Sequence, residues 1–218
     1  MGNLGSISFS WGAGGNHLRW LLFLDHRMFN PFAIQNKIKF IQTHVYTVDR
    51  TWNNWLKVEW EFRKELDQQI SIEHELWNWE RNADLVNKKI LFLKLDNINL
   101  AAQHYFHINP CMNAFNITKY LVDSKKWQDE LEVVKNQNLP NHGLLTVDTI
   151  FNKELDYQLY KKLVDFFGFD DNYSQAAEIH KLYYQARQRS ARDFYNCFTS
   201  AEVTSFLNSM KKLGFDNE

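Results

Sequence analysis

Three glycines stand within four positions near the start of the chain, at Gly12, Gly14 and Gly15. They follow a short apolar run and come directly before a segment with helical spacing. Glycine has no Cβ, so the backbone N–H groups of such a turn can converge on an anion, and the positive end of the helix dipole adds to the attraction. The segment predicts a phosphate-type anion site, with a tight strand-to-helix turn that binds no ligand as an equally weighted alternative.

The residues after these glycines disfavour ATP hydrolysis. An ATPase loop places Lys and then Ser or Thr there, to hold the outer phosphates and Mg²⁺. This chain has Asn16 and His17 at those positions. The imidazole of His17 could donate a hydrogen bond to a bound anion or simply cap the turn. If the glycines serve only ligand approach, replacing Gly15 with Val is expected to abolish anion binding and leave the fold largely intact.

Two further residues are expected at the same edge of a sheet. His44 lies at the end of an apolar run, and the unperturbed pKa of histidine, near neutrality, suits a proton-accepting base. A hydrogen-bonded core histidine is the alternative. Arg50 follows the same run and could contact a phosphate, or it could pair with Asp49 or Glu59.

The elements that must position these residues alternate between strand and helix patterns. Apolar runs of strand length occupy residues 7–11, 39–46, 89–95 and 144–150, and amphipathic segments of helical period occupy residues 51–66, 156–167 and 173–195. This alternation predicts an α/β fold in which helices flank a mostly parallel sheet. No repeat or linker interrupts the chain, so residues 1–218 are expected to form a single domain.

Composition limits the classes of partner. The chain carries 25 basic and 26 acidic residues, so no overall field attracts nucleic acid. Cys111 and Cys197 are too few for a disulfide framework, which fits a reducing, cytoplasmic compartment. No apolar run reaches the ~18 residues of a membrane span. The histidines and carboxylates lack a metal-ligand spacing such as His-Glu-x-x-His, so no metal is expected.

Four segments together resemble the P-loop sulfotransferase family, whose members transfer a sulfuryl group from 3'-phosphoadenosine 5'-phosphosulfate (PAPS) to a hydroxyl or amine. Residues 9–18 resemble the family's 5'-phosphosulfate loop. Residues 40–45 resemble the strand Ile-Lys-Thr-His-Leu, which carries the catalytic histidine. Residues 89–102 resemble the 3'-phosphate region, and residues 145–169 resemble the closing strand and helix. The segments occur in the family's order and span most of the chain.

The resemblance implies a three-layer P-loop-type fold and a PAPS-dependent sulfotransferase whose acceptor is a small molecule or carbohydrate. It implies that His44 is the catalytic base, with His17 assisting from the loop. The residues implied in cofactor binding are Gly12, Ala13, Gly14, Gly15, Asn16, His17, Leu18, Arg50 and Lys94. The arginines late in the chain are a candidate lid over the nucleotide, or a solvated surface: Arg187, Arg189 and Arg192.

Three departures from the family pattern weaken the expected grip on the cofactor. The family's loop lysine falls on Ala13, its 3'-phosphate arginine on Lys94 and its 3'-phosphate serine on Ala102. Lys94 can pair with a phosphate as a point charge but cannot form the two-pronged contact of arginine. Arg19 or Lys39 could replace the lost loop charge. Two alternatives therefore stay open: a catalytically silent nucleotide-binding or interaction module that retains the fold, and a kinase-like phosphoryl transferase, which the missing Lys-Thr pair disfavours.

Overall fold

The computed structural model describes residues 4–10, 13–28, 68–73, 88–97, 114–136 and 139–196, together with positions 199, 201, 204–205, 208 and 211–212. The predicted strand 39–46 and the predicted helix 51–66 lie outside these residues. So do three of the candidate site residues, Gly12, His44 and Arg50.

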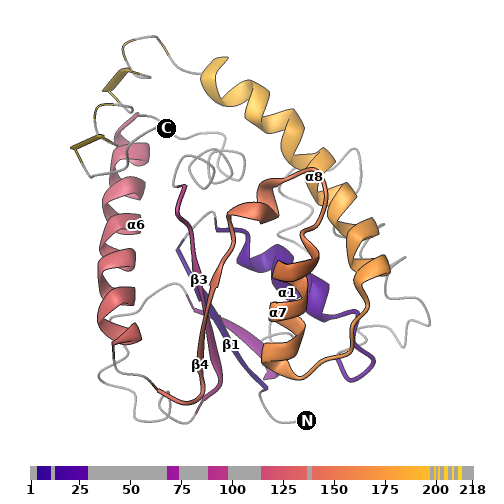
Figure 1. Ribbon diagram of the computed structural model, residues 1–218. Coiled ribbons are helices and arrows are strands. Elements are labelled where there is room, and N and C mark those ends of the chain that lie inside the picture. The colour runs from indigo at the N-terminus through magenta and orange to yellow at the C-terminus, as the bar shows by residue number, and fades with distance from the viewer. Residues whose placement is uncertain are drawn as a thin grey trace.

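The described part of the chain contains a sheet of four parallel strands in the order β2-β1-β3-β4 (Figure 1). The strands are β1 (Gly5–Phe9), β2 (Ile70–Glu73), β3 (Ile90–Lys94) and β4 (His142–Thr146). Parallel strands are joined by crossover connections, usually helices, which lie on the faces of the sheet. The predicted α/β class with a parallel sheet is confirmed.

Helices cover both faces of this sheet. On one face, α1 (Gly15–Leu22), α7 (Tyr157–Phe167) and α8 (Tyr173–Asn196) contact one another. On the other face lies α6 (Ala114–Lys135) (Figure 1). A 3₁₀ turn, η3 (Asp148–Phe151), leads from β4 towards α7. The result is the expected three-layer arrangement of helix, sheet and helix.

Alternating side chains give the two faces of the sheet different partners. Ile7 and Leu91 are register partners, and both belong to the large hydrophobic cluster shared with α1 and α7. Ser8 and Phe92 are partners on the opposite face, where Phe92 belongs to a smaller cluster with Trp127 of α6. Because successive strand residues point to opposite faces, the sheet separates the two clusters.

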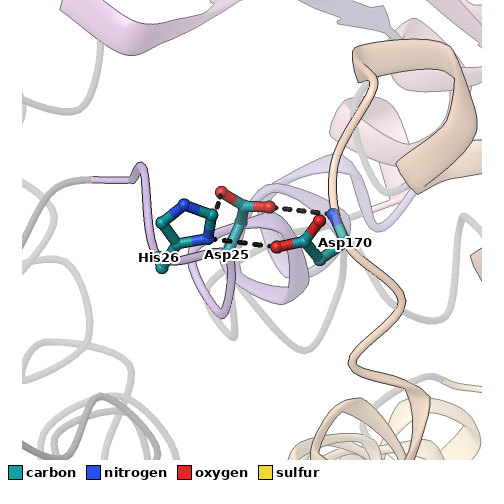
Figure 2. Close-up of side chains that lie close together, drawn as sticks. All are labelled: Asp25, His26 and Asp170. Carbon is teal, nitrogen blue, oxygen red and sulfur yellow. Dashed lines mark hydrogen bonds and ion pairs between the residues drawn. The ribbon is translucent and has the colours of Figure 1, made fainter.

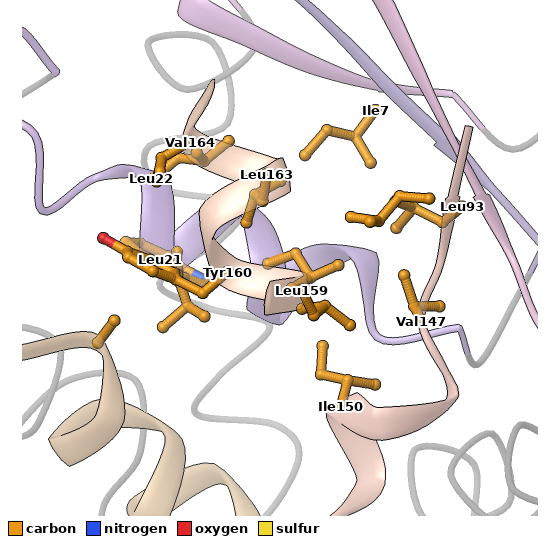
Figure 3. Packing of buried hydrophobic residues seen from close by; sticks show 14 of the residues in the cluster. Ile7, Leu21, Leu22, Leu93, Val147, Ile150, Leu159, Tyr160, Leu163 and Val164 are labelled. Atoms are coloured by element: carbon orange, nitrogen blue, oxygen red, sulfur yellow. The ribbon is translucent and has the colours of Figure 1, made fainter. Parts of the chain in front are cut away.

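The large cluster fixes α7 against the sheet. Figure 3 shows Ile7 and Leu93 of the sheet on one side and Leu159 and Leu163 of α7 on the other. Ile7, Leu93 and Leu163 expose none of their surface. Burying one such side chain contributes roughly 1.5–3 kcal/mol. This packing holds the strands whose ends carry the candidate site.

Local signals at both ends of α7 explain why it could be predicted. The Asp156 carboxylate accepts hydrogen bonds from the N–H groups of Gln158 and Leu159, at 2.8 and 3.4 Å. Gly168 ends the helix with φ 72°, a left-handed conformation that favours glycine. The predicted helix 156–167 is confirmed, and the predicted helix 173–195 corresponds to α8.

The strand boundaries differ from the predicted ones. β1 begins at Gly5 rather than at residue 7, and β4 runs from His142 to Thr146 rather than from 144 to 150. β2 and α6 have no counterpart among the predicted elements. β2 is only four residues long, and only Ile70 in it is fully buried, so it carries little apolar signal.

The apolar run after β4 turns instead of continuing the sheet. The carboxylate of Asp148 accepts hydrogen bonds from the N–H groups of Asp96 and Asn97, at 2.9 and 2.6 Å. Asp148 thereby joins the chain after β4 to the chain after β3. Because the Asp148 side chain accepts these backbone hydrogen bonds, strand pairing does not continue past β4. The 3₁₀ turn η3 begins at Asp148.

Candidate functional site

The order of the strands identifies where an open α/β sheet binds ligands. β1 is followed along the chain by β2 on one side, and β3 lies on its other side. α1, which follows β1, and α6, which follows β3, lie on opposite faces. In such sheets ligands bind outside the carboxyl ends of the strands, at the point where the strand order reverses. Here that point lies between the ends of β1 and β3.

The turn between β1 and α1 stands at this point and has the geometry of an anion site. The N–H of Ala13 donates to the carbonyl oxygen of Ser10 at 3.2 Å, and Gly14 precedes α1 in a left-handed conformation with φ 72°. No side chain in the part of the chain that the structure describes caps α1. Among the described residues, the N–H groups of Gly15 and Asn16 have no hydrogen-bond acceptor. Such N–H groups at a helix start are donors for an anion.

Most side chains of the turn point into the protein. Ala13 and Leu18 expose none of their surface, and His17 exposes only 2%. Asn16 alone among the residues from 13 to 18 is partly exposed. A ligand at this turn would therefore meet backbone N–H groups and the side chain of Asn16.

Gly15 is required by packing and not only by ligand approach. A Cβ at this position would stand 2.2 Å from two ring carbons of Phe9, which is itself buried. No real Cβ tolerates such a distance, so a side chain at Gly15 must displace the ring. The expectation that Gly15→Val leaves the fold intact is therefore wrong.

His17 lies between α1 and α8 rather than over the turn. Its Nε2 is 3.2 Å from Nδ1 of His180, and Nε2 of His180 is 2.9 Å from the carbonyl oxygen of Asn152. The ring of His17 also stacks on Tyr183, with the centroids 3.8 Å apart and the planes 5° from parallel. The hydrogen bond to His180 and the stacking on Tyr183 are both internal, so they occupy His17 without a ligand.

Lys94 stands at the carboxyl end of β3, as predicted, but it is already paired. Its Nζ lies 2.9 Å from a carboxylate oxygen of Asp96. This hydrogen bond is the main cause of a raised pKa for Lys94, to which Glu132 and Asp148 also contribute. A phosphate at Lys94 would have to compete with three nearby carboxylates.

The other cations considered from the sequence are placed differently. Arg19 is buried, and its Nη1 lies 3.4 Å from the carbonyl oxygen of Ile70, at the amino end of β2. It therefore does not supply the missing charge at the glycine turn. The helix α8 continues through the positions of Arg187, Arg189 and Arg192.

Asp25, His26 and Asp170 form a cluster that sequence spacing does not reveal (Figure 2). Atoms that could ligate a metal lie within 4.8 Å of one another. Asp25 Oδ1 accepts hydrogen bonds from the backbone N–H and Nε of Arg27, and Oδ2 accepts from Nη2 of Arg27 and the N–H of Asp170, all at 2.8–2.9 Å. With both oxygens occupied, Asp25 ties the end of α1 to the residues after α7.

The electrostatics of Asp25 agree with this structural role. Burial alone would raise the pKa of the carboxyl group, but the hydrogen bonds from Arg27 and Asp170 hold that pKa well below its usual range. Arg27 also donates to the carbonyl oxygen of Gly168 at 2.8 Å and lies over the ring of Phe169. The group is best described as an ion pair between a buried carboxylate and an exposed guanidinium.

None of the described helices is long and apolar enough to cross a membrane. No protein-family model, no curated protein and no solved structure matches the chain.

Proposed function

We propose that the chain is a sulfotransferase-like enzyme that holds the phosphosulfate group of PAPS at the turn between β1 and α1. The observation that supports this is the uncapped start of α1 behind Gly14, at the point where the strand order reverses. The N–H groups of Gly15 and Asn16 are the donors for the anion. The resemblance of the loop, of the Thr43-His44 segment and of the last strand and helix to the sulfotransferase family supplies the identity of the ligand.

In this proposal the bound cofactor supplies the sulfuryl group. The backbone N–H groups of the turn hold the oxygens on which negative charge grows as the bond to the leaving phosphate breaks. His44 takes the proton of the acceptor hydroxyl or amine, and the acceptor atom forms the new bond to sulfur in line with the leaving phosphate. Arg50 is a further candidate for a phosphate contact.

The catalytically silent nucleotide-binding module is the second candidate, and two observations favour it. Ala13, which takes the place of the family's loop lysine, is fully buried and brings no charge to the turn. Lys94 is paired with Asp96. Both features lower the expected affinity for the two phosphate groups of PAPS, so binding without transfer is the outcome that would establish this candidate.

The proposal extends to partners and location. The acceptor is a small molecule or a carbohydrate, and the protein acts in the cytoplasm without nucleic acid or membrane. The balance of 25 basic and 26 acidic residues and the two cysteines support these assignments.

A thermal-shift series tests the proposal. The protein is heated in buffer, with adenosine 3',5'-bisphosphate and with ATP, and release of adenosine 3',5'-bisphosphate from PAPS is followed with a mixture of hydroxyl acceptors. Stabilisation by the bisphosphate and its release from PAPS support the enzyme. Stabilisation by the bisphosphate without release supports the silent nucleotide-binding module. Stabilisation by ATP alone favours the kinase-like alternative, and stabilisation by neither favours an interaction module.

Asn16→Asp should separate ligand binding from folding. A carboxylate in the first turn of α1 favours the helix by about 0.3–1 kcal/mol, so the melting temperature should not fall. The same charge repels a bound anion: at ~5 Å and an effective dielectric constant of ~20, two unit charges interact by about 3 kcal/mol. We expect the affinity for adenosine 3',5'-bisphosphate to fall at least about tenfold by calorimetry.

Asn141→Asp is the matched control for this experiment. It makes the same change of charge on an exposed residue at the amino end of β4, the opposite edge of the sheet. Its affinity should equal that of the wild type. If Asn16→Asp and Asn141→Asp bind adenosine 3',5'-bisphosphate equally well, the anion site does not lie at the start of α1.

A further inference from the structure

When both rings are neutral, the hydrogen bonds of His17 and His180 have one direction. The carbonyl oxygen of Asn152 can only accept, so the Nε2 of His180 at 2.9 Å carries a hydrogen. In the neutral ring Nδ1 is then the acceptor, and the Nε2 of His17 donates to it at 3.2 Å. The chain of donors runs from α1 through α8 to the residue after η3.

This chain begins in the first turn of α1, directly after the anion turn. His17 is the third residue of α1, and its ring stacks on Tyr183 one turn after His180. Tyr183 also lies near the turn, because its Oη would stand 3.3 Å from a Cβ added at Gly14. Gly14, which has the left-handed conformation before α1, therefore lies close to α8, the helix whose residues contact His17.

Burying the two imidazole rings costs free energy, which their hydrogen bonds must offset. His17 and His180 are 2% and 0% exposed, and buried polar groups destabilise a protein unless each is hydrogen-bonded. An apolar pair would fill the same space but would not fix the rotation of α1 about its axis. The two hydrogen bonds do fix it, because each needs one orientation of its ring.

We infer that His180 is a positioning residue: by accepting the hydrogen bond of His17 it holds the start of α1 in the orientation that presents the N–H groups of Gly15 and Asn16 to an anion. The inference rests on the proposed anion site, but its effect on the turn exists without ligand. The hydrogen bond from the N–H of Leu18 to the carbonyl oxygen of Gly14, at 3.1 Å, reports whether the turn is formed.

Two substitutions at position 180 divide its two hydrogen bonds. The amide of His180→Asn reaches the place of Nδ1 and keeps the acceptor for His17, whereas the amide of His180→Gln reaches the place of Nε2 and keeps only the bond to Asn152. We expect His180→Gln to weaken binding of adenosine 3',5'-bisphosphate about tenfold, as the loss of one positioning hydrogen bond does. His180→Asn should stay within about twofold of the wild type.

Ile179→Ala is the matched control, because Ile179 is a neighbouring residue of α8 that exposes none of its surface and belongs to the hydrophobic cluster. It should lower the melting temperature without changing affinity. Amide hydrogen exchange of Leu18, measured relative to that of Leu93 in β3, should rise in His180→Gln and not in His180→Asn or Ile179→Ala. If His180→Gln does not fold, the same comparison is made at position 17. His17 bonds through its Nε2, whose place the amide of glutamine reaches, so His17→Asn should bind adenosine 3',5'-bisphosphate more weakly than His17→Gln.

The outcomes separate this inference from the proposed function. Equal affinity and equal Leu18 exchange in the two variants at position 180 would overturn the positioning role. If the wild-type protein binds no anion, the proposed anion site is overturned. The positioning role is still retained if the Leu18 amide exchanges faster in His180→Gln than in His180→Asn. Affinity that simply follows melting temperature, including in Ile179→Ala, would show that His180 acts only through stability.

Discussion

Gly15→Ala is expected to destabilise the protein by about 3 kcal/mol, although helix propensity alone predicts the opposite sign. Alanine in place of glycine within a helix usually stabilises by roughly 1 kcal/mol. Here the added Cβ would stand 2.2 Å from the Phe9 ring, in a core where overpacking costs about 1–3 kcal/mol or more. The contact decides the sign, and Gly15→Val should prevent folding. Urea denaturation of Gly15→Ala measures the effect.

Two further variants test the physical cause. A Cβ at Gly168 would meet nothing within 4 Å, so Gly168→Ala should cost only the left-handed conformation, about 1 kcal/mol. Phe9→Val removes the ring and keeps a residue that suits a strand. The double variant Gly15→Ala with Phe9→Val should be no less stable than Phe9→Val alone, a coupling of roughly 2–3 kcal/mol. Additive losses would contradict the contact.

The part of the fold that could be predicted is the part with local signals. Asp156 and Gly168 mark the ends of α7 through hydrogen bonds and a left-handed turn that involve only neighbouring residues. β3 is an apolar run whose first four residues are buried, and its predicted position agrees with the structure. β2 could not be found in this way, because its pairing with β1 is a long-range contact and its own residues are mostly half-buried.

The candidate site was predictable only at the level of the backbone. The glycine turn follows from residue types at successive positions, and Gly14 has the left-handed conformation that this pattern favours. The partner of His17 is 163 residues away, so no spacing in the sequence reveals that His17 is internally bonded. Lys94 was correctly placed at a strand end, whereas its pairing with Asp96 depends on how the chain turns after β3.

The bonding of Asp25 was missed for the same reason, since one hydrogen bond to its carboxylate comes from the backbone N–H of Asp170, 145 residues away in the sequence. Its nearer partner, Arg27, gives no signal, because charged residues two apart are common on protein surfaces. Only the burial of Asp25, at 2% exposed, distinguishes this pair from an ordinary surface contact. That burial gives the pair a measurable effect on stability.

Asp25→Asn should destabilise the protein by about 2–3 kcal/mol at neutral pH. The amide nitrogen that replaces one carboxylate oxygen would face donors of Arg27 or Asp170, and hydrogen bonds to a charged group contribute roughly 1.5–3 kcal/mol. Asp170→Asn is the matched control: its carboxylate is 62% exposed and pairs with His26 at the surface, so its loss should cost less than about 1 kcal/mol.

The pH dependence of this difference identifies the charge as its cause. The pKa of Asp25 is lowered in the folded state, while an aspartate in the unfolded chain titrates near about 3.9. A lowered folded pKa stabilises the protein above the unfolded pKa, and this contribution is lost as the pH falls towards the folded value. The difference in unfolding free energy between wild type and Asp25→Asn should therefore be full above about pH 5 and shrink steadily towards pH 2. A difference that stays constant over that range would mean that the charge of Asp25, and with it the ion pair with Arg27, is not a source of stability.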